Sequence, residues 1–484
     1  MGKKSDTIIS NVIWKFAERI LAQLVSLIVS IELARILLPD DYGAITMVSV
    51  FITVANVFVT SGIPYALIQK KDADELDFSS CFHFNLGLSV LIYILLFFTA
   101  PYIAAFYEID VLSPVVRVMG LRIIIASINS VQHSYVSRHM MFKKYFWSTL
   151  FGTLVSGVVG IWMALKGLGV WALVAQYMTN TVIDTIVLFI TVNWRPKLIF
   201  SFSRVVTLFR FGWKILFEGL SNTFVGELHK LIIGKVYTEA DLAYYGKGQQ
   251  FPGLIVNNIT TAIGSVLFPA MSDEQDNKER VLDILRKSVR TSTYVVFPML
   301  TGLAATAMPF ITVVLTDKWI ETVPYLQVLC LIYAPTVGMI PRHQAINSIG
   351  RSDVFMYEHI IARVISIIVL LFTYKISILA IVLGSLISTT ILSLIIAYTS
   401  KKFNDYSYKD QLKDILPTLI GCLIMGIPVY FLSYLNLPML LILIMQVIVG
   451  IVIYFAYSKI FKLEELRICV SYLLVLKDKL TKKQ

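Results

Sequence analysis

The chain of 484 residues is 57% hydrophobic and only 15% charged, with a mean hydropathy of +0.75. Soluble domains carry about 25% charged residues, so this composition excludes a soluble globular protein and indicates an all-α integral membrane protein. The formal net charge of +11 does not indicate nucleic-acid binding, because the basic residues fall in the segments between apolar stretches.

Apolar stretches follow one another along almost the whole chain. A window of about 20 residues predicts about fourteen membrane-spanning helices. These predicted spans are residues 10–37, 41–64, 79–105, 112–136, 144–165, 168–193, 206–236, 241–270, 282–312, 322–347, 353–374, 377–400, 412–434 and 437–460. An amphipathic segment over residues 463–478 follows, and we expect it to lie along the membrane surface.

Loops rich in Lys and Arg alternate with loops that carry few basic residues. The positive-inside rule assigns the basic loops, and both termini, to the cytoplasm. All loops are short, so neither face has room for a catalytic domain. The basic set comprises Lys3/Lys4, Lys70/Lys71, Arg138/Lys143/Lys144, Arg195/Lys197/Arg204, Lys278/Arg280/Arg286/Lys287, Arg351, Lys401/Lys402/Lys409/Lys413 and Lys459/Lys462.

Patterns typical of enzymes are not found. The four cysteines (Cys81, Cys330, Cys422 and Cys469) lie in or beside apolar runs and have neither metal-ligand nor disulfide spacing. No Ser-His-Asp, Cys-His, zinc or phosphate-loop spacing occurs in the right context. The sequence therefore predicts no enzyme, no metal and no cofactor.

An internal repeat organises the spans. WKFAERIL, at residues 14–21, matches WKILFEGL, at residues 213–220, and each opens a long helix. Each helix is followed by a short acidic loop that ends in Tyr-Gly, at Gly43 and at Gly246. The first and seventh spans thus correspond, which predicts two six-helix lobes in parallel orientation. The expected division is residues 1–200, residues 201–403, and residues 404–484 with two further helices and a cytoplasmic tail.

Polar side chains line one face of several spans when successive positions are placed about 100° apart. Such stripes must face protein or water rather than lipid. On equivalent helices of two lobes, they indicate a shared, water-filled central cleft. The stripes are Lys15, Glu18 and Arg19 in the first span; Tyr42, Thr53 and Asn56 in the second; Arg122, Asn129 and His133 in the fourth; Lys214, Glu218, Asn222 and His229 in the seventh; and Lys247, Gln250 and Asn257 in the eighth.

Each stripe also has a purely structural interpretation, which the sequence leaves open. Lys15 and Arg19 lie near enough to the membrane surface to extend their charges into water. Stripes of Ser and Thr also hold helices together. Single histidines, such as His133, His229 and His343, are more typical of structure than of proton transfer.

Several stretches, in order along most of the chain, resemble one known family. They are ELARILLPDDYGAITMVSVF (32–51), SGIPYALIQKKD (61–72), GLGVWALVAQ (167–176), KLIIGKVYTEADLAYYGKGQQFP (230–252), NNITTAIGSVLFPAMS (257–272) and GRSDVF (350–355). The chain resembles the Wzx-type flippases, in particular the WzxC-like branch, of the multidrug/oligosaccharidyl-lipid/polysaccharide (MOP) exporter superfamily. The stretch after about residue 405 carries little of the resemblance.

The resemblance implies a V-shaped bundle of two six-helix lobes that rock to give alternating access, with two extra C-terminal helices. It implies a bacterial cytoplasmic (inner) membrane protein that carries an oligosaccharide on undecaprenyl pyrophosphate for lipopolysaccharide, O-antigen, capsule or exopolysaccharide synthesis. Coupling to a proton or sodium gradient is expected, with no other cofactor. Membrane lipids, a polysaccharide polymerase and a chain-length regulator are the expected partners.

Candidate residues divide by the chemistry that each group of the cargo needs. Pyrophosphate favours cationic side chains, and the candidates are Lys15, Arg19, Arg122, Lys214 and Lys247. A glycan favours amides, hydroxyls and aromatic rings, and the candidates are Tyr42, Thr53, Asn56, Asn222, Tyr245, Gln250 and Asn257. Ion coupling needs titratable groups, and the candidates are Glu18, Glu218 and His229.

Two other functions remain open from the sequence. A MATE-like multidrug or cation antiporter shares the expected fold, but it favours acidic residues in its cleft, whereas this cleft has more Lys and Arg. A membrane glycan polymerase or ligase needs a large outer loop with catalytic residues, and the outer loops here are short. A lipid II flippase differs from the main hypothesis only in its cargo.

Overall fold

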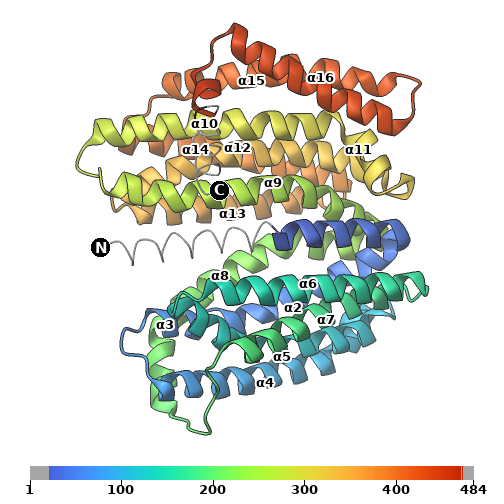
Figure 1. Cartoon of the computed structure of the whole chain (residues 1–484), viewed down its shortest axis with the longest axis vertical. Coiled ribbons are helices and arrows are strands. Elements are labelled where there is room, and N and C mark those ends of the chain that lie inside the picture. Colours follow the sequence, from blue (N-terminus) through green and yellow to red (C-terminus); the bar gives the residue numbers. More distant parts are fainter. Residues whose placement is uncertain (1–20, 470, 472–484) are drawn as a thin grey trace, which may run out of the picture. The chain divides into compact units, whose positions relative to one another are not determined.

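The computed structural model describes residues 21–469 and residue 471, and within this part every regular element is a helix (Figure 1). This confirms the all-α prediction. The chain divides into two compact units, Met1–Ala243 and Tyr244–Gln484. The predicted division into residues 1–200, 201–403 and 404–484 follows the repeat rather than compactness, and it stays a prediction.

In the first unit, residues 21–36 form the described part of the first helix. The helices that follow are α2 (Pro39–Thr60), α3 (Ile63–Gln69), α4 (Glu75–Tyr107), α5 (Leu112–Arg138), α6 (Phe142–Leu165), α7 (Val170–Thr191) and α8 (Phe202–Val236). Helix α9 (Glu239–Ser272) begins in the first unit and continues into the second.

The second unit continues with α10 (Lys278–Ala305), α11 (Ala307–Val314), the 3-10 turn η1 (Asp317–Trp319), α12 (Thr322–Ser348), α13 (Ser352–Thr373), α14 (Ile378–Asn404), α15 (Tyr408–Phe431), η2 (Leu432–Tyr434) and α16 (Met439–Ile460). Residues 464–469 are helical, at the start of the predicted amphipathic segment, and the rest of that segment lies almost wholly outside the described residues.

Most of these helices are long and apolar enough to cross a membrane. The described part contains eleven such spans, or twelve when α10 and α11 are counted as one bent span. Helix α8 does not qualify by composition, because Arg204, Arg210, Lys214, Glu218, Glu227, Lys230 and Lys235 all lie in it. The first helix is only partly described. The count of fourteen spans therefore stays a prediction.

Two of the predicted spans are broken. The span expected at 41–64 ends at Thr60, and α3 starts after Gly62, whose φ of 75° suits a residue without Cβ. The span expected at 282–312 bends by 73° between α10 and α11. Pro309 lies in the first turn of α11. A proline there lacks the N–H that would continue a helix from α10.

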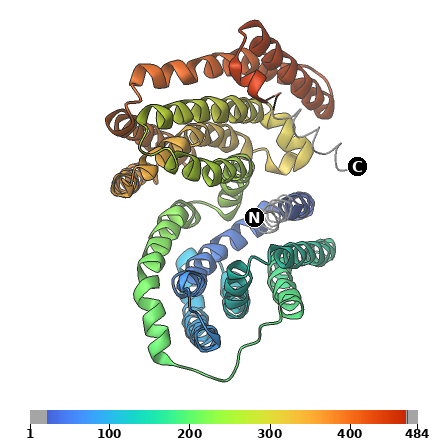
Figure 2. The ribbon, with the colours of Figure 1, turned by 60° about the vertical axis from the view of Figure 1, so that its left-hand side comes forward.

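Helix α8 packs along α2, α3 and α4 of the first unit (Figure 2). Its closest approach is at Gly212, where a Cβ atom would lie 2.6 Å from the carbonyl oxygen of Gly62. No side chain fits there, so glycine at both positions lets the two backbones touch. This contact fixes α8 against the break between α2 and α3.

Basic loops of the first unit meet at one end of its bundle. The buried carboxylate of Asp77 accepts from Lys70 Nζ at 2.7 Å and lies 3.5 Å from Arg204. Arg138 donates to the carbonyl oxygens of Leu67 and Lys70. Three of the predicted basic loops, which contain Lys70, Arg138 and Arg204, therefore lie at the same end of this unit. Asp74 caps α4, and the N–H of Asp77, donated to its carboxylate, lowers the pKa of Asp74.

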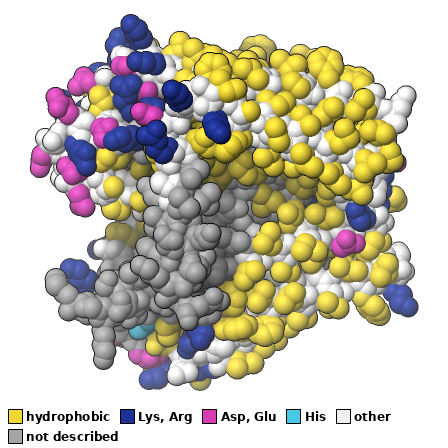
Figure 3. Space-filling view, turned by 45° about the horizontal axis from the view of Figure 1, so that its top comes forward, with side chains coloured by type: hydrophobic (Ala, Val, Ile, Leu, Met, Phe, Trp, Pro, Cys, Tyr) yellow, Lys and Arg dark blue, Asp and Glu magenta, His cyan; other side chains and the backbone are white. Residues whose placement is uncertain are grey.

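In the second unit, α10 packs between α12 and α15, and α12 also packs against α14. Arg286, near the N-terminal end of α10, connects this helix to α15 by two hydrogen bonds to Asp414, at 2.9 and 3.0 Å. Arg290 pairs with Glu465, at 2.5 Å. In the upper part of Figure 3, charged side chains gather at the left edge and hydrophobic side chains cover most of the remainder of that part.

Candidate functional site

Three of the fifteen predicted site residues, Lys15, Glu18 and Arg19, lie outside the described residues. The others lie on α2, α5, α8 and α9. Those on α2, α5 and α8 belong to the first unit, and Tyr245, Lys247, Gln250 and Asn257 belong to the second. The structure therefore tests their surroundings within each unit, and the cleft between the lobes stays a prediction.

On α2, the hydroxyl stripe is partly satisfied by its own helix. Thr46 donates to the carbonyl oxygen of Tyr42 at 2.6 Å, and Thr60 donates to that of Asn56 at 2.8 Å. Tyr42 is buried and donates to the carbonyl oxygen of Ser30 in the first helix at 3.2 Å. Thr53 is exposed and Asn56 half-buried. Tyr42 thus packs against the first helix, whereas the Thr53 side chain is exposed; their roles as glycan ligands stay predictions.

Arg122 of α5 is held by α7. Its Nε donates to Thr181 Oγ1 at 3.1 Å, and its guanidinium carbon lies 5.1 Å from the ring centre of Tyr177. Stacking on an aromatic ring and one hydrogen bond fix the side chain, and the remaining N–H groups of the guanidinium can still bind an anion.

One turn beyond Thr181 lies the only charged residue of α7, Asp184. Asn129 of α5 donates to its carboxylate at 2.5 Å, and His133 Nε2 lies 3.5 Å from the same oxygen. The ring of Tyr145 from α6 stacks on His133 at 4.7 Å. The predicted polar face of α5 therefore contacts an acid, Asp184, that the sequence analysis did not name. A single ionisable residue within a predicted span is a signal that could have identified it.

Helix α8 presents Lys214, Glu218 and Asn222 at steps of four residues, all exposed on one face. His229 is half-buried further along. Between them and the helix end, Glu227 and Lys230 form an ion pair of 2.8 Å with side chains 20% and 23% exposed. Sequence reasoning also missed this pair. Charges within a span pair with one another because lone charges in hydrocarbon are costly.

On α9, the structure brings together two of the predicted residues. Lys247 is buried, and its Nζ donates to Gln250 Oε1 at 3.3 Å and lies 5.8 Å from the ring centre of the buried Trp319. Tyr245 is buried and Asn257 is exposed. A cation held by an amide and an aromatic ring is a suitable partner for a phosphate oxygen or a sugar hydroxyl.

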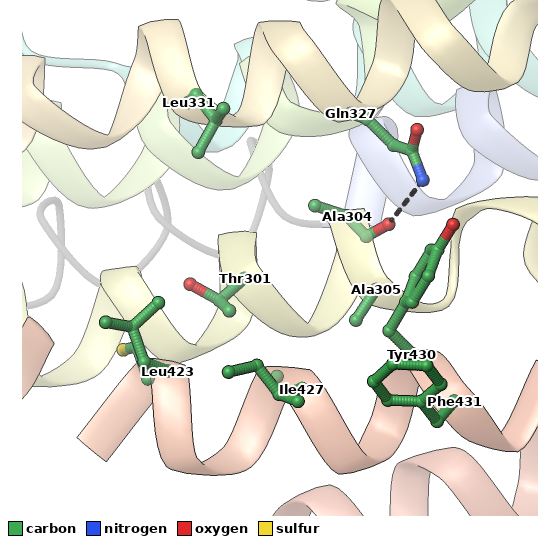
Figure 4. Close-up of a pocket in the computed structure, with 11 residues that line it drawn as sticks. Thr301, Ala304, Ala305, Gln327, Leu331, Leu423, Ile427, Tyr430 and Phe431 are labelled. Atoms are coloured by element: carbon green, nitrogen blue, oxygen red, sulfur yellow. Dashed lines mark hydrogen bonds between the residues drawn. The ribbon is translucent and has the colours of Figure 1, made fainter. Parts of the chain in front are cut away.

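The second unit also has an apolar cavity of about 290 Å³ between α10, α12 and α15 (Figure 4). Its one polar contact on view is the 3.3 Å bond from Gln327 Nε2 to the carbonyl oxygen of Ala304, at the end of α10. Leu331, Leu423 and Phe431 at its edge are largely exposed. The residues lining it are Thr301, Ala304, Ala305, Gln327, Leu331, Cys422, Leu423, Gly426, Ile427, Tyr430 and Phe431. We call it the α10–α15 groove.

Among the described residues, no group of three or more His, Cys, Asp or Glu side chains could hold a metal ion. The chemistry available in this part of the chain is therefore cationic side chains for an anion, amides, hydroxyls and aromatic rings for a polar headgroup, an apolar groove, and an acid, Asp184, that contacts an amide and an imidazole.

The fold is that of the transporters of the MOP superfamily. The lipid II flippase MurJ, in an inward closed conformation, aligns over 94% of this chain and 98% of its own with a TM-score of 0.73 at 17% identity. An inward-facing multidrug resistance transporter of the MATE family aligns less closely, over 79% of this chain and 94% of its own, with a TM-score of 0.60 at 14% identity.

Residues 32–324 match the family described as "Polysaccharide biosynthesis protein", so the chain belongs to this family. The succinoglycan biosynthesis transport protein ExoT of Rhizobium meliloti is 26% identical over 69% of this chain and 67% of its own. The lipopolysaccharide biosynthesis protein WzxC of Escherichia coli is 23% identical over 67% and 66%. The matches span about two thirds of these relatives' length. The predicted resemblance is confirmed.

Proposed function

We propose that this protein is a flippase that moves a lipid-linked oligosaccharide, the repeat unit of a surface polysaccharide, across the bacterial cytoplasmic membrane. The observation that carries the proposal is the family match over residues 32–324, combined with a fold shared with a lipid II flippase over 94% of the chain. The proposed carrier is undecaprenyl pyrophosphate, moved from the cytoplasmic to the outer leaflet as the two repeats rock.

The side chains suit each part of such a cargo. Arg122, Lys214 and Lys247 offer cations for the pyrophosphate. Thr53, Asn222 and Gln250 offer hydroxyl and amide groups for the glycan. The α10–α15 groove is apolar and open at its edge, which suits the hydrocarbon tail of the carrier, since apolar chains bind where they remain out of water.

Finer parts of the proposal follow from the basic loops and from the resemblance. Both termini are cytoplasmic, transport is driven by a proton or sodium gradient, and the protein acts without catalysing a reaction. A polysaccharide polymerase and a chain-length regulator would use the delivered unit. Lys15, Glu18 and Arg19 stay candidates for the mouth of the cleft, and Glu218 and His229 stay candidates for ion coupling.

The test is a gene deletion followed by mass spectrometry of the extracted membrane lipids. We expect lipid-linked oligosaccharide to accumulate while the matching surface polysaccharide is lost. An impermeant glycosidase, added to intact spheroplasts, should leave the accumulated lipid intact, because it remains in the inner leaflet. If the lipid is digested, the defect is in a polymerase step instead. No accumulation, together with new sensitivity to cationic dyes, would favour a drug antiporter.

The tail-binding role of the α10–α15 groove is tested by complementation of that deletion. Leu331→Trp places a larger ring in the groove, and we expect it to lower surface polysaccharide severalfold. Leu371→Trp, at an exposed position of α13 outside the groove, is the matched control and should complement fully. Equal complementation by the two variants would remove the groove from the proposal.

A further inference from the structure

The second unit contains a buried histidine–carboxylate pair that the proposed cargo site does not use. His343 of α12 has its Nε2 3.2 Å from Oε2 of Glu358 in α13, and the two side chains are 8% and 2% exposed. Thr399 of α14 donates its hydroxyl to Oε1 of the same carboxylate. Three helices thus meet at one acid that is removed from solvent.

The first unit contains the corresponding pair, His133 and Asp184. His133 lies 21 residues after Leu112, the first residue of α5, and His343 lies 21 residues after Thr322, the first residue of α12. These are the fourth helices of the two repeats. The two histidines therefore occupy equivalent places in the two repeats.

The acid and the hydroxyl lie on different helices in the two repeats. In the first repeat the acid, Asp184, is on the sixth helix, and Ser148 of the fifth helix lies beside it. In the second repeat the acid, Glu358, is on the fifth helix and Thr399 of the sixth donates to it. Ser148 and Glu358 each follow the first residue of their helix by six positions. Each repeat thus brings together a histidine, an acid and a hydroxyl, but the fifth and sixth helices supply the acid and the hydroxyl in the opposite order.

The net charge of such a pair depends on how many protons it holds. With one proton, shared by imidazole and carboxylate, the pair is neutral overall; with none it carries −1, and with two it carries +1. A net charge away from water is costly. At the buried His343–Glu358 pair, protons will therefore bind or leave mainly when water reaches it, which ties its proton occupancy to the state of the surrounding helices. His133 and Asp184, with side chains 36% and 17% exposed, are more open.

Other charged and titratable groups around the pairs set this balance. Around the His343–Glu358 pair they are His359 and Arg363, on the same helix as Glu358. The rings of His343 and His359 are 5.4 Å apart. Arg342 precedes His343 on α12 and lies near Tyr406. Helix α14 contributes only the Thr399 hydroxyl to the contacts at Glu358. Around Asp184, α5 contributes Asn129 and His133, and Arg122 lies on the same face of α5 but bonds to Thr181.

The neighbours favour a proton over a metal cation. Hard cations need a shell of several oxygen ligands, whereas Glu358 is faced by one hydroxyl and one imidazole nitrogen. We propose that the His343–Glu358 and His133–Asp184 pairs are proton-binding sites, one in each repeat. Their role in driving transport rests on the proposed function, but proton binding itself is measured without cargo.

The experiment is infrared difference spectroscopy of the purified full-length protein in liposomes, between about pH 5 and about pH 8, the range in which histidine-linked sites titrate. We expect a pH-dependent difference band from the carboxylates of the two pairs, because the carboxylate vibration shifts when the neighbouring imidazole takes up or loses a proton. Glu358→Gln and Asp184→Asn should each remove about half of the band, and the double variant should remove all of it. Glu464→Gln, at an exposed acid of which 73% of the side chain is accessible, is the control and should leave this band unchanged.

Several outcomes would overturn the proposal. One is a double variant whose spectrum equals that of the unchanged protein. Another is a band that sodium chloride, used in place of potassium chloride, suppresses, because the site would then bind a metal cation. If Glu358→Gln does not fold, Glu358→Asp keeps a titratable acid and should shift the band rather than remove it; an unshifted band would refute the assignment. The gene-deletion test is independent of these results.

Discussion

Replacing Asp414 by Asn is expected to loosen α15 from α10 within the second unit. The Asp414 side chain is only 4% exposed, it accepts two hydrogen bonds from Arg286 at 2.9 and 3.0 Å, and Tyr406 donates to it at 2.9 Å. Breaking a buried ion pair costs about 3–5 kcal/mol. Arg286 is 33% exposed and still has Asp410 at 3.5 Å, so we place the loss at or just below the lower end of this range, at about 2–3 kcal/mol.

The assay is equilibrium unfolding of the purified protein in mixed micelles with increasing SDS. The control is Asp353→Asn, which removes the partner of Arg351 in a pair whose side chains are 45% and 48% exposed. Solvent and salt screen exposed pairs, so the control should change stability far less. Arg286→Leu with Asp414→Leu should recover much of the loss, because no unpaired charge remains. Equal losses for Asp414→Asn and Asp353→Asn would refute the reasoning.

Three further predictions concern the same structure. Gly212→Ala should destabilise the protein by about 1–3 kcal/mol, because its Cβ meets the backbone of Gly62. The control is Gly226→Ala on the same helix, which has nothing within 4 Å and should be neutral or stabilising by up to about 1 kcal/mol. Equal SDS unfolding midpoints for the two variants would contradict the contact. In a Cys469→Ser background, Thr53→Cys and Asn222→Cys should react with a soluble maleimide about tenfold faster than Leu95→Cys, an exposed apolar position of α4. The reason is that thiols react as hydrated thiolates. Equal rates would contradict the prediction of a water-filled cleft. Burial, and then the charge of Asp414, raise the pKa of Tyr406. The stability of the protein should therefore be constant below about pH 10, the ordinary tyrosine pKa, and should fall as the pH rises above it. The unfolding midpoint of Tyr406→Phe should not fall in this way, and an unchanged slope would show that other groups cause it.

Much of the helical framework could be predicted, because span length follows from the length of an apolar run. The predicted spans 112–136 and 353–374 agree closely with α5 and α13. The break after α2 was missed, although Gly62 and Pro64 are an ordinary signal for one. The bend between α10 and α11 depends on Pro309 in a run that hydropathy alone reads as continuous.

The contacts of the candidate site could not be predicted, because they join residues that are distant in sequence. The polar face of α5 was correct, but only the fold shows that Asn129 and His133 meet Asp184, which lies 55 residues beyond Asn129. Likewise, His343 was set aside as a single histidine until its place opposite Glu358 was visible. Periodicity gives the face of a helix and not the identity of the helix that covers it.

The charges of α8 have a consequence for how the chain is made. A segment with seven acidic or basic residues is poorly retained by the bilayer when it leaves the ribosome alone. Its contact surfaces on α2, α3 and α4 are translated earlier and are already available when it emerges. Insertion of α8 therefore depends on a preassembled N-terminal bundle, and a gene fragment that starts at α8 should fail to integrate this helix.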